Sequence, residues 1–363
     1  MLKDDSRCQN AATSRRTKSN SIEKKKDSVA SLKPDAYKTR CFTLQSPLHA
    51  DSVTCAIGVR SGLVLSASAD KTIKLSNYER QEVIRNWSGH QEEVTKMSYC
   101  SLPAKQFIVT GSRDTTVRIW NFCTSESARV LEGHEFVVTG VATALDGQVC
   151  SGSRDNSIKI WDIETGACIR TTKQPRNLVT HICWSKQLEL LAQTSEDKEL
   201  KLWDIRRGLS EPVQTFEKKQ HILSHCDVSH DGLYCLTSSN GFNGNGCELT
   251  LYDLRQQRLI HEFVGHEQSV NCALFLPQNF AQSRFPLILS VSTDHSVRVW
   301  NRDTQNCLWV ENIPSGGSLL TASYNHDGSV LVGGQHCCLA KLVLVQEYGK
   351  TYLAPQTMQI AAS

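Results

Sequence analysis

A seven-residue phrase recurs along this chain of 363 residues. It reads DTTVRIW at residues 114–120, DNSIKIW at residues 155–161 and DHSVRVW at residues 294–300. A related phrase, DKELKLW, occupies residues 197–203, and a degraded copy, DKTIKLS, occupies residues 70–76. Such an internal repeat constrains the fold more than any single residue does, because every copy has to form the same structural unit.

The spacing of the copies predicts a ring of β-sheets. Six closing positions follow one another at intervals of 44, 41, 42, 49 and 48 residues, close to the roughly 40 to 45 residues of one four-stranded propeller blade. They are Ser76, Trp120, Trp161, Trp203, Tyr252 and Trp300. Residues 318–345 keep the strand pattern and supply a seventh unit. In the third unit, alternating apolar residues predict strands at 137–144, 149–153 and 157–162. The chain is therefore expected to be an all-β, seven-bladed propeller.

Two recurring dipeptides point to a family. Trp-Asp or Trp-Asn closes four units, and Gly-His occurs at residues 89–90, 133–134 and 265–266. At this separation the two motifs resemble WD repeats, over about residues 46–345. In WD repeats a His, an Asp, a Trp and a strand Ser or Thr form a buried hydrogen-bonded network. The resemblance assigns that network to His90, Asp114, Trp120, His134, Asp155, Trp161, Asp197, Trp203, His266, Asp294 and Trp300.

The His-Asp pairs are interpreted as structural rather than catalytic. They recur in several units and have no nucleophile at a common position, whereas an active site is normally made once. We expect no enzymatic activity, no cofactor and no metal site. Units one, four, five and seven depart from the pattern, so their blades are expected to depend more on strand packing than on the polar network. Trp87, just before a Gly-His pair, is expected to contribute much less to stability than Trp161.

The two ends of the chain differ from the repeats. Residues 1–40 hold eleven Lys or Arg against five acids, while the remainder holds 29 basic against 32 acidic residues. Residues 1–38 are predicted to be a disordered basic tail, because they hold few large apolar side chains. Residues 39–45 are predicted to close the ring as an outer strand of the last blade, within a propeller spanning residues 39–346. Residues 347–363 are then a C-terminal extension.

Candidate partner-binding residues lie at one rim of the central channel. In WD propellers the residue before each turn aspartate and residues flanking the first strand commonly contact partners. This resemblance implies a binding rim that contains Glu93, Arg113, Val137, Arg154, Leu178, Glu196 and Thr293. Two arginines on consecutive blades suit a carboxylate or phosphate, although both could pair with Glu93 and Glu196 instead. The glycine-rich segment 241–246 is either a long mobile hairpin or a loop that presents Phe242 to a partner.

The function expected from these features is a non-catalytic protein-interaction scaffold. Part of the chain resembles a family member connected with cilia, which implies ciliary trafficking factors or small-GTPase regulators as partners and a cytoplasmic or ciliary location. No apolar stretch approaches the roughly 18 residues of a spanning helix. The basic tail suits weak contact with an anionic membrane or an import receptor, and nucleic acid is the weakest candidate because the folded part is slightly acidic. The alternative function is a substrate receptor of a cullin-type ubiquitin ligase, suggested by Trp203-Asp204-Ile205-Arg206.

Overall fold

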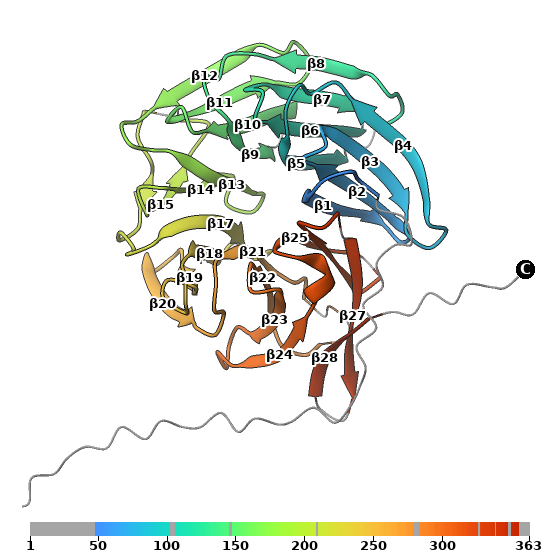
Figure 1. Ribbon diagram of the computed structural model, residues 1–363. Helices are drawn as coiled ribbons and strands as arrows, with labels where there is room; N and C mark the ends of the chain where they lie inside the picture. The colour runs from blue at the N-terminus through green and yellow to red at the C-terminus, as the bar shows by residue number, and fades with distance from the viewer. Residues whose placement is uncertain are drawn as a thin grey trace, which may run out of the picture. The chain divides into compact units, whose positions relative to one another are not determined.

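Figure 1 shows a computed structural model of the chain. It describes residues 48–355, apart from residues 102–105, 145–146, 208–209, 279, 281–282, 326, 338 and 348–349. The described residues belong to one compact unit. The predicted tail at residues 1–38 and the predicted closing strand at residues 39–45 lie outside them.

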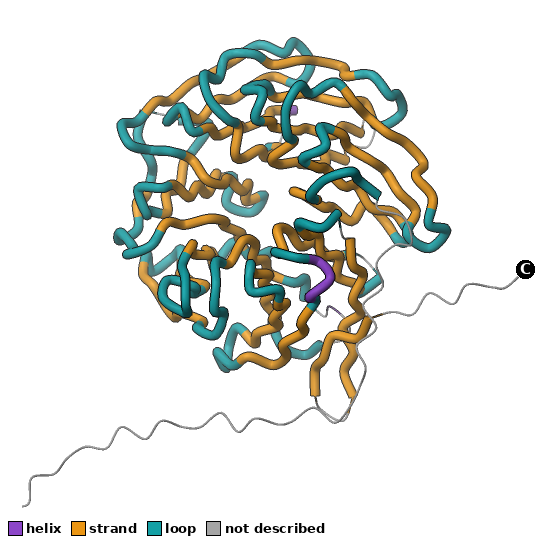
Figure 2. Tube along the Cα trace, viewed as in Figure 1, coloured by secondary structure: helices purple, strands orange, loops and turns teal. Residues whose placement is uncertain are grey.

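Seven antiparallel sheets of four strands each make up this unit, and we number them as blades one to seven in chain order. Figure 2 shows how strands and loops account for almost all of it. The strands, blade by blade, are β1 (Val53–Arg60), β2 (Leu63–Ser68), β3 (Thr72–Asn77) and β4 (Glu82–Ser88); β5 (Val94–Ser101), β6 (Gln106–Ser112), β7 (Val117–Asn121) and β8 (Ser127–Leu131); β9 (Val138–Thr143), β10 (Gln148–Ser153), β11 (Ser157–Asp162) and β12 (Cys168–Lys173); β13 (Val179–Ser185), β14 (Leu190–Ser195), β15 (Leu200–Trp203) and β16 (Gln214–Thr215); β17 (Ile222–Val228), β18 (Tyr234–Asn240), β19 (Leu249–Asp253) and β20 (Arg258–Phe263); β21 (Val270–Phe275), β22 (Leu287–Ser292), β23 (Ser296–Asn301) and β24 (Cys307–Asn312); and β25 (Leu319–Tyr324), β26 (Ser329–Gly334), β27 (Leu339–Glu347) and β28 (Lys350–Pro355).

The blades form a closed ring. Each innermost strand packs against the innermost strand of the next blade, and β25 packs against β1 (Figure 1). The apolar core lies between the sheets, where neighbouring blades share clusters of buried side chains. Among the described residues, the short helix η3 (Pro314–Gly316) connects blades six and seven, and no helix is long and apolar enough to cross a membrane. The prediction of a seven-bladed all-β propeller is confirmed.

Blade three illustrates how the repeat phrase forms its turn. Asp155 follows β10, and its Oδ1 accepts a hydrogen bond of 2.8 Å from the backbone N–H of Ser157. Asn156, between them, has a φ of 68°, a left-handed conformation that Asn tolerates better than most residues do. The aspartate therefore fixes the tight turn that starts β11, in addition to any role in a larger network.

The last blade is completed by the C-terminal part of the described chain. Its sheet order is β25-β26-β27-β28, so the outermost strand is residues 350–355. Leu353 of β28 is buried in the same apolar cluster as Leu342 and Leu344 of β27. The propeller therefore extends to Pro355, beyond the boundary at residue 346 that the sequence predicts. The reason is that β28 pairs with residues 342–347 of β27 and covers an edge that would otherwise lie open.

Hydrogen bonds from polar side chains join neighbouring blades, and we call each contact between adjacent innermost strands a seam. In six seams, the residue after the first buried position of the innermost strand donates to a carbonyl of the next blade. The Thr139 hydroxyl, for example, lies 2.6 Å from the carbonyl oxygen of Val179. The donors are Thr54, Thr95, Thr139, Thr180, Ser224 and Asn271. The seam from blade seven to blade one has Leu320 at this position, which offers no such bond.

That last seam is held by a different set of contacts, around Tyr78. Its buried hydroxyl lies 3.0 Å from Oδ2 of Asp327 and accepts a hydrogen bond of 3.1 Å from Nδ2 of Asn325. The backbone N–H of Gly62 donates to the same hydroxyl at 3.0 Å. Gly58 of β1 lies so close to Asn325 that any side chain at this position would collide with it.

Candidate interaction surface

One face of the ring carries the turns between second and third strands together with the links between blades; we call it the rim face. Backbone hydrogen bonds fix each turn against the innermost strand of its own blade. The N–H of Arg113 donates to the carbonyl of Glu93 at 2.9 Å, and the N–H of Arg154 donates to that of Val137 at 3.0 Å. The same bond joins Glu196 to Leu178 and Thr293 to Ser269, both at 2.9 Å. The predicted rim residues therefore occupy equivalent, rigidly held positions on four consecutive or nearby blades.

The predicted network is present in blade three. Nδ1 of His134 lies 2.8 Å from Oδ2 of Asp155, and Nε2 lies 2.8 Å from the hydroxyl of Ser151. The indole N–H of Trp161 donates to the same hydroxyl at 2.7 Å. Burial raises the pKa of Asp155, but hydrogen bonds from His134, Ser157 and the Glu135 N–H outweigh it and hold the pKa below its usual value. Every polar group in this set has a partner, so the network also fixes the blade geometry.

Two other blades repeat this arrangement with nearly the same distances. In blade two, His90 joins Asp114 and Thr110, and the Trp120 indole donates to Thr110 at 2.8 Å. In blade six, His266 joins Asp294 and Ser290, and the Trp300 indole donates to Ser290 at 2.9 Å. The three histidines are buried in equivalent places, which agrees with a structural rather than a catalytic role.

Blade four builds a network from other residue types. The Trp203 indole donates to Oε1 of Gln193 at 2.7 Å, and the Gln193 amide donates to Oδ1 of Asn177 at 2.6 Å. Lys201 forms an ion pair with Asp197 and also donates to Asn177. The sequence reasoning missed three members of this network, Asn177, Gln193 and Lys201. One signal was available, because Gln193 stands ten residues before Trp203, as Ser151 does before Trp161.

Blade one also keeps a polar network, in spite of Ser76 at its closing position. Nδ1 of His49 lies 2.9 Å from Oδ2 of Asp70, and Nε2 lies 2.8 Å from the hydroxyl of Ser66. The expectation that blades one and four depend less on such networks is therefore wrong. The physical reason is that a buried indole or imidazole N–H needs a partner, and several residue types can supply one.

The two rim arginines form ion pairs and remain half exposed. Nε of Arg113 lies 3.3 Å from Oε2 of Glu93 in the same blade, and Arg154 pairs with Glu196 of the next blade. The exposed fractions of the Arg113 and Arg154 side chains are 58% and 51%, so each guanidinium still presents donors to solvent. The glutamates orient the arginines without hiding them, and exposed pairs of this kind contribute little to stability.

Phe242 is displayed on the rim face by a loop that is tied down. Its side chain is 68% exposed, while its backbone bridges to Gln268 of the neighbouring link. The N–H of Gly244 donates to the Glu267 carbonyl at 2.8 Å. Gly246 has a φ of 72°, and a side chain there would collide with His221. The glycines thus allow a tight turn whose backbone is held in place by hydrogen bonds.

Phe136 was missed by the sequence reasoning. It directly precedes Val137 on the rim face of blade three and is 60% exposed. The backbone carbonyl of Phe136 accepts a hydrogen bond of 3.0 Å from the hydroxyl of Ser153, and this bond fixes the backbone that carries the phenyl ring. The available signal was its position, because it stands between a Gly-His pair and the first strand, in a link that belongs to the rim face.

The innermost strands carry polar and sulfur-containing side chains at one shared position. The third position of the innermost strands, counted from the first buried residue, holds Cys55, Lys96, His181, His225 and Cys272 among others. The rings of His181 and His225 stack with centroids 3.8 Å apart, and burial lowers the pKa of both. Among the described residues no group of three His, Cys, Asp or Glu is arranged to hold a metal ion.

Comparisons with known proteins agree with this architecture. A model of the WD domain, G-beta repeat, matches residues 81–121, 125–162, 166–204 and 257–301. WD repeat-containing protein 37 of Xenopus laevis is 29% identical over 213 residues, which cover 56% of this chain and 43% of that protein. Nuclear distribution protein PAC1 of Ajellomyces capsulatus is 28% identical over 281 residues, covering 72% of this chain and 59% of its own length. The matched part of this chain therefore spans less than two thirds of the length of either relative. The repeats, the blades and these matches together support a WD-repeat family for this chain, which folds as a seven-bladed β-propeller.

Proposed function

We propose that this propeller is a non-catalytic scaffold that holds protein partners on its rim face and regulates ciliary protein trafficking or cilium assembly. WD-repeat proteins generally act as protein-interaction scaffolds, and the rim face offers a surface suited to that role. The observation that carries the proposal is the joint display of Arg113, Arg154, Phe136 and Phe242 on fixed backbone, all more than half exposed.

The chemistry of these four side chains favours a protein partner. Arginine and large aromatic residues are enriched where protein interfaces bind most strongly, because they combine apolar area with hydrogen bonding. Fixed backbone reduces the entropy lost on binding. A partner surface with carboxylates near apolar side chains would match both kinds of group, since carboxylates can bind the free donors of each guanidinium.

The ciliary part of the proposal rests on a resemblance. The stretch from residue 176 to residue 256, with RNLVTHICW, CDVSHDG and SSNGFNGNGCELTLYDLRQ, resembles WD-repeat-containing protein 31. That resemblance implies partners among ciliary trafficking factors or small-GTPase regulators, and a location in the cytoplasm with access to the cilium or its base. The fold carries no such information by itself.

The test compares three forms of the full chain in ciliated cells by proximity labelling and quantitative pull-down. The first form carries Arg113→Ala with Arg154→Ala, and the second carries Phe242→Ala. The control carries Arg80→Ala with Arg258→Ala, because both arginines are exposed and lie on the face opposite to the rim face. We expect ciliary transport proteins among the neighbours, and a loss of about tenfold in recovery for the first two forms only. Equal recovery from all three forms would refute the rim face as the binding surface. A neighbour set without ciliary proteins would refute the ciliary role.

A second candidate function is a substrate receptor of a cullin-type ubiquitin ligase. The observation in its favour is Arg206, which follows Trp203-Asp204-Ile205 and is exposed on the face opposite to the rim face. Nε of Arg206 lies 3.2 Å from Oδ1 of Asp204, and Glu189 also binds the guanidinium. Ligase adaptors that co-purify with the wild-type chain and are lost with Arg206→Ala would favour this function over the first.

A further inference from the structure

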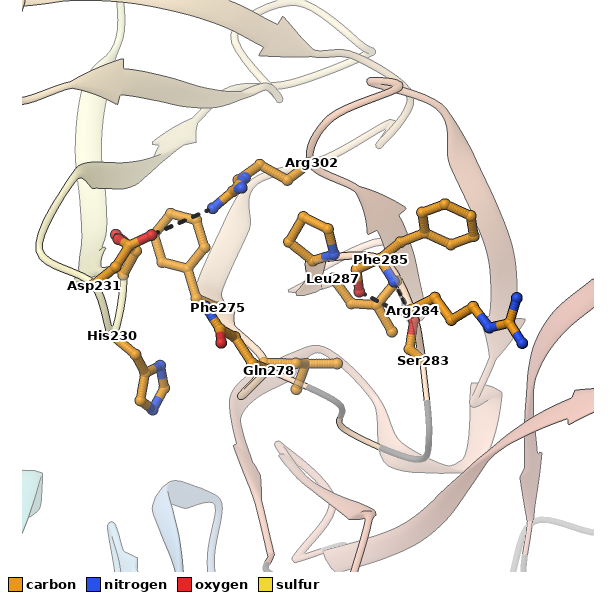
Figure 3. Close-up of a pocket in the computed structure, with 12 residues that line it drawn as sticks. His230, Asp231, Phe275, Gln278, Ser283, Arg284, Phe285, Leu287 and Arg302 are labelled. Atoms are coloured by element: carbon orange, nitrogen blue, oxygen red, sulfur yellow. Dashed lines mark hydrogen bonds and ion pairs between the residues drawn. The ribbon is translucent and has the colours of Figure 1, made fainter.

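A cleft of about 230 Å³ opens on the face opposite to the rim face, between blades five and six (Figure 3). It forms because a long connection lies beside a short one. The link from β21 to β22 runs from Leu276 to Pro286, whereas the β17–β18 hairpin of the neighbouring blade turns at Asp231 and Gly232. Phe275 and Leu287 line the cleft from the ends of these strands and are almost fully buried.

Hydrogen bonds hold the described residues 283–285 at the outer wall of the cleft. Ser283 is buried, its hydroxyl donates to the carbonyl of Phe285 at 3.0 Å, and it accepts from the Phe285 N–H at 3.2 Å. Phe280 anchors the same connection by packing its ring against that of Tyr324 at a centroid distance of 6.1 Å. Arg284 and Phe285 are thereby held at the mouth in exposed positions, and the Phe285 side chain is 54% exposed.

The cleft has a positive charge balance. Two arginines and one aspartate line it among the described residues. Asp231 is bound within the protein, because Oδ1 accepts a hydrogen bond of 2.9 Å from the Leu233 N–H and Oδ2 lies 3.9 Å from Arg302. Arg302 in turn donates to Asp303 at 3.0 Å and stacks over the ring of Tyr234. Arg284, on the side of the cleft away from Asp231 in Figure 3, is the cation presented to solvent.

Size and charge together indicate the occupant. Pockets for whole small molecules usually hold about 300 to 1,000 Å³, so this cleft is suited to a single large side chain. Its apolar floor and the exposed Phe285 ring favour an aromatic or long aliphatic group, and Arg284 favours carboxylates next to it. We infer that this cleft binds a short acidic peptide segment of a partner protein, which inserts one large apolar side chain between blades five and six. The site is separate from the rim face and does not depend on the function proposed there.

The inference is tested with the full chain and three synthetic peptides. The first is the fluorescein-labelled sequence Gly-Asp-Glu-Phe-Asp-Glu-Gly; the second replaces Phe with Ala, and the third replaces the four acids with Lys. Binding is measured by fluorescence anisotropy. The variants are Arg284→Glu and Phe285→Ala, with Arg80→Glu as the matched control, because Arg80 is an exposed arginine in a turn on the same face but outside the cleft.

We expect the acidic Phe peptide to bind with a Kd below about 1 mM and to weaken at least about tenfold with Arg284→Glu. Arg80→Glu should leave its Kd within about twofold, and a rise in salt should weaken the binding. A benzophenone in place of the Phe ring should crosslink to residues of the cleft. Absence of binding below about 1 mM, equal binding of the Lys or Ala peptide, or crosslinks confined to the rim face would each overturn the inference.

Discussion

The hydroxyl of Tyr78 lies 3.0 Å from the carboxylate of Asp327, although the two residues belong to the first and the last blade. The Lys341 ammonium pairs with the same carboxylate at 3.3 Å and lies 4.4 Å from the centre of the Tyr78 ring. Burial raises the pKa of Asp327, but hydrogen bonds from Ser329 and Tyr78 and the charge of Lys341 outweigh it and lower the pKa overall. Tyr78 therefore joins blade one to two polar side chains of blade seven, Asn325 and Asp327, at the seam that lacks a bond from Leu320.

Tyr78→Phe should lower the free energy of unfolding by about 1 to 3 kcal/mol, because it leaves the Asn325 amide and the Gly62 N–H without their partner. Urea unfolding of Tyr78→Phe, Asp327→Asn and the double variant measures the coupling between the two residues. We expect a coupling of at least about 0.5 kcal/mol. Strict additivity of the two single effects would contradict the role assigned to this pair.

Trp87→Ala and Trp161→Ala should each cost about 3 to 5 kcal/mol of stability. The sequence alone predicts a much smaller cost for Trp87, but in the structure this side chain is completely buried, and its indole donates to the Thr124 carbonyl at 2.6 Å. Denaturant midpoints of the two variants provide the measurement. A Trp87→Ala midpoint close to that of the wild type would restore the earlier expectation.

Gln193→Leu should destabilise the protein by about 1 to 3 kcal/mol, because the buried Trp203 indole and the Asn177 side chain both lose a partner. Gln278→Leu provides the control, since Gln278 is exposed and such substitutions stay within about 0.5 kcal/mol. Thermal unfolding at one protein concentration compares the two. If both variants melt together, the network of blade four contributes nothing measurable.

Stability should fall as the pH drops below about 4, in part through Asp155. Its folded pKa is lower than its unfolded value, so its contribution is present above the unfolded pKa and is lost as the pH falls through the folded pKa. Asp155→Asn cannot take up the proton, so its unfolding free energy should change less between pH 5 and pH 3 than that of the wild type. The exposed Glu126→Gln serves as the control. Parallel curves for Asp155→Asn and the wild type would argue against this linkage.

Removal of residues 350–363 should cause a large loss of stability, because it deletes β28, uncovers the edge of β27 and removes the buried Leu353. Removal of residues 356–363 alone is the control and should leave the described blade intact. Circular dichroism during heating measures both. Equal melting of the two truncations would mean that another segment, such as the predicted strand at residues 39–45, completes the blade.

The sequence predicted the blades well because strand alternation and the Asp-to-Trp spacing are local patterns that repeat. It predicted the His134, Asp155 and Trp161 arrangement through family resemblance. The partnership of Gln193 with Asn177 went unpredicted although Gln193 has the same spacing from its Trp as Ser151, because Gln and Asn replace the Ser and His of the family pattern and neither type is distinctive alone.

Other features were visible in the sequence but received a different interpretation. Residues flanking the first strand of each blade were expected to contact partners, yet at this position the hydroxyl groups of Thr54, Thr95, Thr139 and Thr180 bond to the next blade. The pattern could not distinguish the two uses, since both require a polar residue at the start of a strand. Tyr78 and Asp327 could not be paired from the sequence either, because only the closed ring brings them together.

The place of β28 in the chain has a consequence for biosynthesis. Lys350–Pro355 leaves the ribosome after every other strand of the described ring, so blade seven lacks its edge until all the other strands have emerged. A nascent chain that has emerged up to β26 can form six complete sheets and the packing of β25 and β26 against β1, but its blade seven still lacks β27 and β28. The apolar surface that β27 and β28 cover in the folded protein is then available to chaperones until these two strands emerge.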